Sequence, residues 1–489
     1  MRIPLINLTF IFVTIAVGIS PSAIAGVPFT ASSDTTKITG PLREDGGIDY
    51  VAALNERLGH GVSSQNNGYV TWLRAVGFKQ LPSSTREKTI SLLGAQGLAG
   101  EKSGWEAYPD SEPIDQTAVK MWKEDEYPKL AAYLNRQAGP LDLAVQAAAA
   151  PQWWAPAVST NGTVAWVLLP ELNSLREVSR LLCDRALLRA KQGDFDGFLS
   201  DVTAAKRLAR RAAGWTIIGH LVAAGIDSFA NQTIGATAGA GIFSSDQCAK
   251  LGKMLDGLDP IPPFWGSVDL GERWSMLDST QCIAMRKSEL LASSHGDDSW
   301  LRSLKNMDTN SVDWNVVMSQ INGHCDDVVS IVKSPSVRDE QIARRVFEFK
   351  ISQMQAEENA HHDLSKEAGE TNEAYTQRVA DGMSVVLLPS IWRADNTCRL
   401  GLTLDQTTRA LVAAAQYRAD KGNWPDTLGA LAPAYLTQVP VDIFSASGTD
   451  PIRYQKTGAG ICLFAHQPPD STASEIGLGI VPDAPTDGL

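Results

Sequence analysis

The sequence predicts a mainly α-helical protein: an irregular domain of helical hairpins, followed by a small C-terminal α+β module. Apolar residues recur at spacings of three and four through most of residues 47–390, as on the buried faces of helices. After Pro440 the spacing changes to two, which is typical of strands. With 489 residues, 44% of them hydrophobic, the chain can bury a sizeable core and divide into more than one domain.

Residues 1–25 have the pattern of a signal peptide. A single early charge, Arg2, precedes the mostly apolar stretch 3–19, and small side chains after it predict cleavage between Ala25 and Gly26. The alternative is an uncleaved anchor, since about 20 apolar residues span a bilayer. Membrane contact is expected only through this segment, if it is not cleaved. The product is therefore expected to be exported, and either periplasmic or secreted.

The overall charge argues against nucleic acid as a partner. The formal net charge is −12, whereas phosphate binding depends on clustered Lys and Arg. Arg207, Arg210 and Arg211 form a local basic patch, but acidic residues are interspersed nearby. A solvated helix face is the simpler interpretation of this patch.

The chain is expected to divide into a linker at 26–46, a helical domain at 47–390, the α+β module at 391–481 and a tail at 482–489, with a possible subdivision near 235–265. Hydrophobic spacing and helix-breaking residues predict helices at 48–54, 69–76, 117–122, 129–137, 141–150, 172–190, 195–213, 215–233, 272–293, 312–332 and 338–368. Gly139-Pro140 is expected to end one of these helices, and the Gly-Ala tract from Gly235 to Gly241 another.

The helices at 172–190 and 195–213 are expected to form an antiparallel hairpin around Gln192-Gly193-Asp194. The turn and its interlocking small and aromatic residues resemble a tetratricopeptide repeat over about 20 residues. No second copy occurs at a 34-residue period, so a regular solenoid is not expected. The alternative is an ordinary helical hairpin.

In the C-terminal module, a helix at 403–421 and strands at 452–454, 461–465 and 476–481 are expected. Residues along some 50 positions resemble the soluble end of type II secretion pseudopilins: Tyr417-Arg418, Gly422-Asn423-Trp424-Pro425, Tyr435-Leu436, Val439-Pro440-Val441-Asp442 and Ile452-Arg453-Tyr454. The resemblance implies a helix packed on a small antiparallel sheet, with Trp424 and Tyr454 as packing anchors. It carries over no calcium ligand, because the loop 445–450 differs. The whole arrangement looks like a family of uncharacterised exported bacterial proteins, and no activity comes with that resemblance.

Six widely spaced cysteines include no Cys-x-x-Cys and no zinc-type cluster. If the helices 272–293 and 312–332 fold back on each other, Cys282 and Cys325 lie at nearly equal distances from the turn. This spacing predicts a disulfide between them. Two free thiols are the alternative.

No motif identifies a reaction, so no catalytic, cofactor-binding or metal-binding residue is assigned. The densest group of potential ligands, Glu357 to Asp363, contains Glu358-x-x-His361 but has no second copy on another helix, which a di-iron site needs. The tract Gly235–Gly241 lacks the Gly-Lys pair of a phosphate loop. His220 lies among apolar residues and is expected to be a hydrogen-bonded core histidine.

Thirteen tryptophans are the one compositional feature that suggests a ligand. Trp153 and Trp154 lie between Pro151 and Pro156, where they could stack on sugars or fill the core. We expect an exported, non-enzymatic protein that binds an envelope protein or glycan. The alternative is an envelope hydrolase acting on a glycan. A cleft with exposed tryptophans and two carboxyls roughly 5 to 10 Å apart favours the hydrolase, and a broad apolar patch favours the binding protein.

Overall fold

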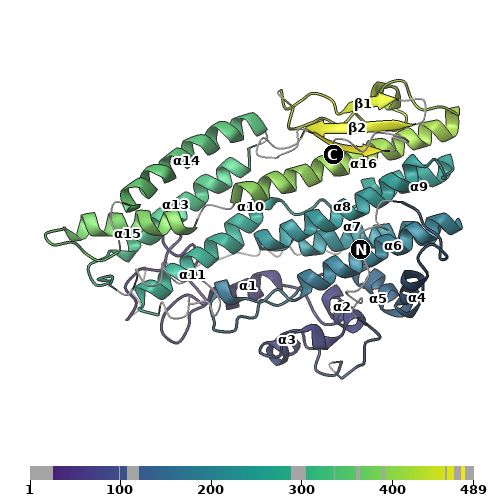
Figure 1. Cartoon of the computed structure of the whole chain (residues 1–489). Helices are drawn as coiled ribbons and strands as arrows, with labels where there is room; N and C mark the ends of the chain where they lie inside the picture. Colours follow the sequence, from purple (N-terminus) through teal and green to yellow (C-terminus); the bar gives the residue numbers. More distant parts are fainter. Residues whose placement is uncertain are drawn as a thin grey trace, which may run out of the picture.

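The computed structural model confirms a mainly helical protein with one small antiparallel sheet (Figure 1). It describes residues 26–98, 100–106, 120–287, 304, 306–334, 336–359, 364–387, 391–445, 447–456, 460–466 and 475–479. The predicted cleavage site lies at the edge of this range, with Ala25 outside it. Within these segments, no helix has the length and hydropathy needed to cross a membrane.

The first half of the chain forms a stack of helices. Their bounds are α1 Tyr50–Leu58, α2 Gly68–Val76, α3 Arg86–Leu92, α4 Pro128–Arg136, α5 Ala138–Ala149, α6 Glu171–Gln192, α7 Phe195–Ala212, α8 Ile217–Gly239 and α9 Ser245–Asp256, with short 3-10 turns at Phe78–Gln80 and Val164–Trp166. The predicted hairpin of α6 and α7 is present. Gly193 adopts a left-handed φ of 81°, and the Asp194 carboxylate accepts the Gly197 N–H at 2.9 Å to cap α7.

The second half adds α10 Phe264–Ser267, a π-helical turn at Val268–Glu272, α11 Arg273–Ala284, α13 Trp314–Val332, α14 Val337–Asn359, α15 Asn372–Leu387 and α16 Ile391–Lys421. A 3-10 turn, Leu428–Leu431, follows α16. The sheet consists of β1 Arg453–Lys456, β2 Ile461–His466 and β3 Glu475–Gly479 in that order. Tyr454 pairs with Leu463, and Leu463 with Leu478.

Several predicted helix ends were wrong. Gly139 and Pro140 lie in the first turn of α5, where proline is tolerated because its missing N–H has no partner there anyway. The Gly-Ala tract continues α8 to Gly239, and α16 begins at Ile391 rather than near 403. α11 ends at Ala284 rather than near 293. The helices α9 and α15 were not expected.

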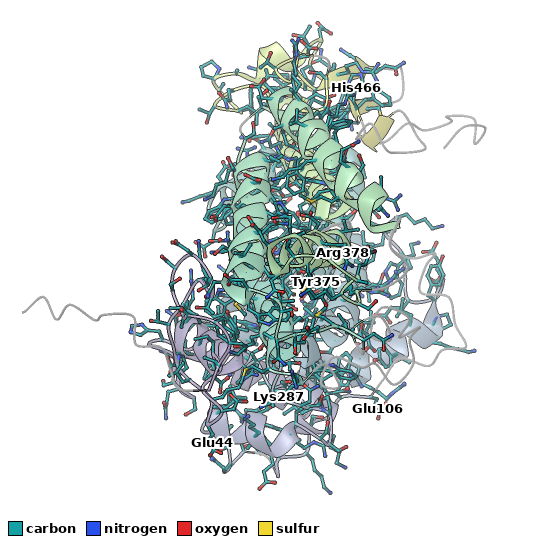
Figure 2. The ribbon with its side chains drawn as sticks, turned by 90° about the vertical axis from the view of Figure 1, so that its left-hand side faces the viewer. Glu44, Glu106, Lys287, Tyr375, Arg378 and His466 are labelled. Atoms are coloured by element: carbon teal, nitrogen blue, oxygen red, sulfur yellow. The ribbon has the colours of Figure 1, made fainter. Side chains whose placement is uncertain are left out.

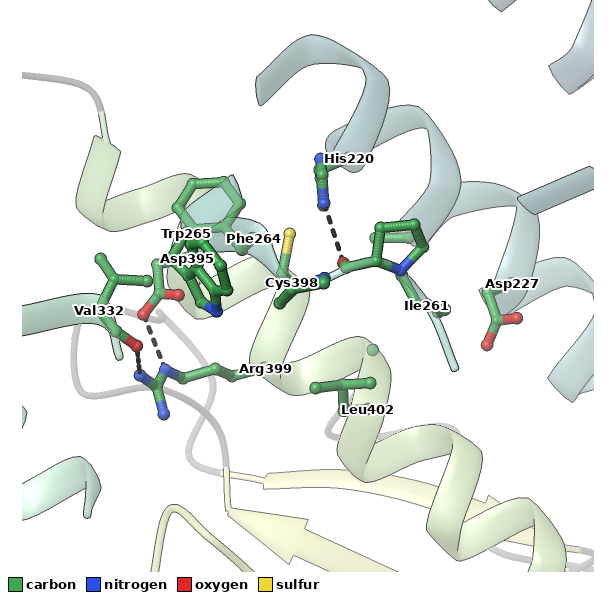
Figure 3. Close-up of a pocket in the computed structure, with 14 residues that line it drawn as sticks. His220, Asp227, Ile261, Phe264, Trp265, Val332, Asp395, Cys398, Arg399 and Leu402 are labelled. Carbon is green, nitrogen blue, oxygen red and sulfur yellow. Dashed lines mark hydrogen bonds and ion pairs between the residues drawn. The ribbon is translucent and has the colours of Figure 1, made fainter. Parts of the chain in front are cut away.

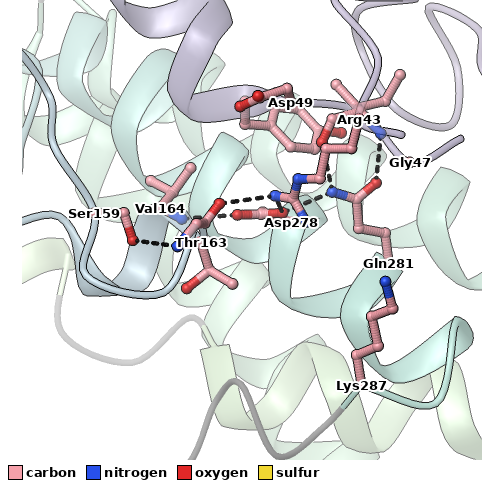
Figure 4. Close-up of polar contacts among 12 residues, drawn as sticks. Arg43, Gly47, Asp49, Ser159, Thr163, Val164, Asp278, Gln281 and Lys287 are labelled. Atoms are coloured by element: carbon pink, nitrogen blue, oxygen red, sulfur yellow. Dashed lines mark hydrogen bonds and ion pairs between the residues drawn. The ribbon is translucent and has the colours of Figure 1, made fainter. Parts of the chain in front are cut away.

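The segment predicted as a linker, 26–46, is packed against the helices. Asn322 of α13 donates to the carbonyls of Ser33 and Asp34 at 2.8 and 3.0 Å. Arg43 reaches α11, where its guanidinium donates to Asp278 at 2.6 Å (Figure 4). The other oxygen of Asp278 accepts the N–H of Val164 at 2.7 Å. One buried carboxylate therefore joins the N-terminal segment, α11 and the turn before α6.

The C-terminal module shares its core with the helical domain. α16 packs along α8 and α9, and the sheet lies over the end of α16 (Figure 1). One buried cluster combines residues of α7, α8, α9 and α16 with Ile461 and Leu463 of β2. In Figure 2, His466 of β2 lies far from Tyr375 and Arg378 of α15. The Nδ1 atom of His466 is 2.7 Å from Oδ2 of the buried Asp442.

The two cysteines of the predicted disulfide are free thiols in the structure. The predicted register was wrong because Arg273 of α11 donates to Asn322 and Asp326 of α13, which sets Cys325 beside Met276, with the sulfur atoms 3.8 Å apart. Cys282 lies six residues further along α11, about 9 Å at 1.5 Å per residue. A disulfide requires Cα atoms within about 7 Å.

Candidate functional site: a cleft lined by tryptophans

A cleft of about 460 Å³ opens where two of the buried clusters meet. On one side, Trp153, Trp154 and Leu169 pack on the cluster built by α2 to α8. On the other, Trp215 and Trp265 pack on the cluster that contains α11 and α13. The walls come from residues 153–155, from 210–216 at the end of α7 and after it, and from 262–270, which include α10 and part of the π-helical turn. The adjoining ends of α1 and α6 complete them. We call this site the tryptophan cleft.

All four of its tryptophans are half-buried, so each keeps part of its indole accessible. The Trp153 ring meets the Tyr69 ring edge-on, with centroids 5.7 Å apart. The backbone of Trp154 is held by one side chain, since Asn67 accepts its N–H and donates to its carbonyl, both at 2.9 Å. The ammonium of Lys333 lies 4.0 Å from the centroid of the Trp265 ring. The indoles are therefore positioned by the protein before any ligand arrives.

Two glycines make room for these tryptophans. A Cβ atom at Gly59 would lie 2.9 Å from ring carbons of Trp154. At Gly271 a Cβ would lie 2.1 Å from the carbonyl oxygen of Trp215. Any larger residue at either position has to displace one wall of the cleft, so the shape of the cleft depends on these two close approaches.

Glu171 places an unpaired carboxyl in the cleft. It is the first residue of α6 and follows Pro170. Burial raises the pKa of Glu171 to about 7, and its own backbone N–H opposes this only in part. No cation of the described segments lies within ion-pair distance of it. Tyr69 is buried nearby, and its pKa is raised by burial and by the Glu171 charge. Perturbed carboxyls in clefts are frequent functional groups.

The other charged groups differ in how they are neutralised. Asp269 pairs with the fully buried Arg273 at 2.7 Å. Arg210 pairs with Asp227 at 3.2 Å. Arg211 donates to the Ala150 carbonyl at 2.6 Å, and Arg57 is exposed. No carboxylate in the described part of the chain lies within 4.0 Å of either Arg211 or Arg57.

A second, smaller pocket of about 190 Å³ shares Pro262, Pro263 and Trp265 with the cleft (Figure 3). His220 lines it, buried as predicted, with Nδ1 3.2 Å from the Thr216 carbonyl and Nε2 3.1 Å from the Pro262 carbonyl. Both ring nitrogens therefore face backbone carbonyls rather than Cys398, and no hydrogen bond joins His220 and Cys398 among the described residues. Burial also raises the pKa of the Cys398 thiol to about 12. A Cys-His catalytic pair is therefore not formed here.

Of the predicted candidates, Trp153 and Trp154 reach the cleft, while Trp424 and Tyr454 lie at the distant junction of α16 and the sheet. The cluster Glu357 to Asp363 falls at the end of α14 and beyond it, and its side chains lie outside the described part of the chain. No group of three or more potential metal ligands occurs among the described residues.

Sequence reasoning missed Trp215, Trp265, Glu171 and Arg211. A shared signal was available, because each cleft tryptophan lies within two residues of a proline or glycine. Pro151 is two residues before Trp153, Pro156 two residues after Trp154, Gly214 directly precedes Trp215, and Gly266 directly follows Trp265.

No family model, no curated protein and no solved structure matches this chain.

Proposed function

We propose that this chain is an exported, non-enzymatic protein that binds a glycan of the cell envelope in the tryptophan cleft. The observation that carries the proposal is the set of four half-buried indoles, preorganised around one concave site of about 460 Å³. Sites of this kind combine aromatic walls with a few polar groups that orient the ligand. Pyranose rings present one apolar face, which suits stacking on indole.

The test is sedimentation of the chain 26–489 with insoluble glycans. Purified peptidoglycan sacculi and chitin serve as probes, and bound protein is measured against protein concentration. We expect Trp265→Leu to weaken binding at least about tenfold, which corresponds to about 1.4 kcal/mol. The matched control is Trp166→Leu, since Trp166 is also half-buried but does not line the cleft. Equal binding by wild type and Trp265→Leu would count against the cleft as the site.

A glycan hydrolase is the second candidate, and Glu171 favours it. A carboxyl with a pKa of about 7 can donate a proton to a glycosidic oxygen, and Asp269 is a second carboxyl in the same cleft. Asp269, however, is engaged by Arg273. Release of reducing ends from sacculi distinguishes the two functions. Release by wild type that is lost in Glu171→Gln, with binding retained, would establish the hydrolase.

We further propose that the chain reaches its ligand outside the cytoplasm after cleavage between Ala25 and Gly26. The support is the apolar segment 3–19 with small residues after it. N-terminal sequencing of the envelope fraction should begin at Gly26. Recovery of the intact N-terminus in membranes would overturn this proposal.

The resemblances to a tetratricopeptide repeat and to pseudopilins are also proposals. The α6–α7 hairpin with its Gly193 turn supports a tetratricopeptide-like unit. The C-terminal sheet supports a pseudopilin-like module, since the Tyr454 hydroxyl donates to the Pro425 carbonyl at 2.6 Å and Asp442 accepts the His466 N–H at 2.8 Å. In such a module these contacts join the helix and its following loop to the sheet.

A further inference from the structure

We infer that the glycan bound in the tryptophan cleft is anionic, and that Arg57 and Arg211 hold a carboxylate on it. This inference rests on the proposed function, and it names the class of glycan. It starts from a contrast: the whole chain carries a formal charge of −12, yet this cleft has two guanidinium groups that no carboxylate of the described residues neutralises.

Each charged side chain of the cleft can be checked for a neighbour of opposite charge. Arg210 is offset by Asp227, and Asp269 by Arg273. Glu171 has no cationic partner among the described residues, but burial raises its pKa to about 7 and so favours its neutral form. The charge that remains is positive and belongs to Arg57 at the mouth and Arg211 in the wall.

Arg211 is the more informative of the two. It is half-buried, and only its donation to the Ala150 carbonyl occupies its fork of N–H groups. Burial and the neighbouring Arg207 both lower the pKa of Arg211, and Asp259 opposes this from beyond ion-pair distance. A half-buried cation that lacks a partner is costly, whereas a bidentate carboxylate would satisfy its remaining donors.

The arrangement fits a glycan with isolated carboxylates better than a dense polyanion. Among the described residues of this region, the cations without an ion pair are few: Arg57, Arg211, the exposed Arg207, and Lys333, whose ammonium lies over the Trp265 ring. A nucleic acid, in contrast, presents closely spaced phosphates to a chain that is acidic overall. The basic patch around 207–211 thus resolves into one structural ion pair at Arg210, one ligand-facing residue at Arg211 and one exposed residue at Arg207. A sugar chain that carries carboxylates at intervals, on the sugars or on attached peptide stems, matches this small number of cations.

The experiment compares one glycan with and without its charge. Peptidoglycan sacculi, whose free carboxyls lie on the peptide stems attached to the sugar chain, are used as purified and after conversion of these carboxyls to amides. Chitin serves as a neutral probe and single-stranded DNA as a polyanion. The variants are Arg211→Gln and Arg57→Gln, and the second keeps the test valid if the first fails to fold, because Arg57 is exposed. The matched control is Arg176→Gln, an exposed arginine of α6 outside the cleft.

We expect wild type to bind native sacculi at least about tenfold more tightly than amidated sacculi. Arg211→Gln and Arg57→Gln should each lose most of that preference while keeping chitin binding, and Arg176→Gln should behave as wild type. Equal binding of native and amidated sacculi overturns the anionic ligand but leaves glycan binding intact. If the wild type binds neither sacculi nor chitin, the proposed function is refuted, and this inference with it. Binding of DNA in preference to sacculi overturns the choice of a glycan.

Discussion

Replacement of Glu171 by glutamine is expected to stabilise the protein at alkaline pH and to leave its stability unchanged in acid. Burial raises the pKa of this carboxyl from 4.5 to about 7. The folded state therefore holds the proton more tightly than the unfolded chain does. The stability that this group contributes is fully present below pH 4.5 and is lost as the pH rises through about 7.

The size of the effect follows from the two pKa values. A rise from 4.5 to about 7 corresponds to about 3 kcal/mol at most, and the partial exposure of Glu171 reduces it. Glutamine keeps the shape of the side chain but never ionises. The free energy of unfolding of Glu171→Gln, relative to wild type, should therefore increase by about 2 kcal/mol between pH 5 and pH 8.5.

Urea unfolding followed by tryptophan fluorescence at these two pH values measures this difference. The comparison with wild type cancels the other titrating groups. Glu87→Gln is the matched control, because Glu87 also lies in the first turn of a helix but is exposed. If the free energies of unfolding of Glu171→Gln and wild type differed by the same amount at both pH values, Glu171 would not be a buried carboxyl with a raised pKa.

Two further predictions concern stability, and a third concerns the cysteines. Lys206→Met is expected to lower the free energy of unfolding by about 3 kcal/mol, because the fully buried ammonium pairs with carboxylates of α8 and α16; a urea midpoint close to that of wild type would contradict this. Trp424→Ala should lower the free energy of unfolding of the full chain by about 3 to 5 kcal/mol, since Trp424 is only 8% exposed. Tyr454→Phe should lower it by about 1 kcal/mol, because the hydrogen bond of the hydroxyl is lost. Little change in either melting curve would argue against a packing role. Peptide mapping without reduction should find Cys282 and Cys325 alkylated separately, and a cross-linked peptide would contradict the register of α11 and α13.

The sequence predicted those helices and turns whose boundaries are set by residues close to them in the chain. The hairpin of α6 and α7 follows from its hydrophobic spacing and from Gly193-Asp194, which both stop one helix and cap the next. The capping box of α9, Ser244 with Gln247, was also readable and was overlooked.

Where tertiary packing decides, local rules failed. The Gly-Ala tract remains helical because α8 packs along α16, and this contact outweighs the low helix propensity of glycine. The first turns of α16, which were not predicted, carry the charged residues Asp395 and Arg399. In the fold, Asp395 is buried and pairs with Arg399 at 2.7 Å, and Arg399 also reaches Glu340 of α14.

The cleft could be predicted only in part, for the same physical reason. Prolines and glycines within two residues of each tryptophan indicate that the indoles lie near helix ends or in connections, but no spacing rule brings Trp154 and Trp265 to one cavity across more than a hundred residues. The raised pKa of Glu171 is even harder to predict from the sequence. Its position at the start of a helix favours the ionised form through the helix dipole, whereas burial favours the neutral form and dominates. Only the packed structure shows which of the two opposing effects is larger, and the pH dependence of Glu171→Gln measures that balance directly.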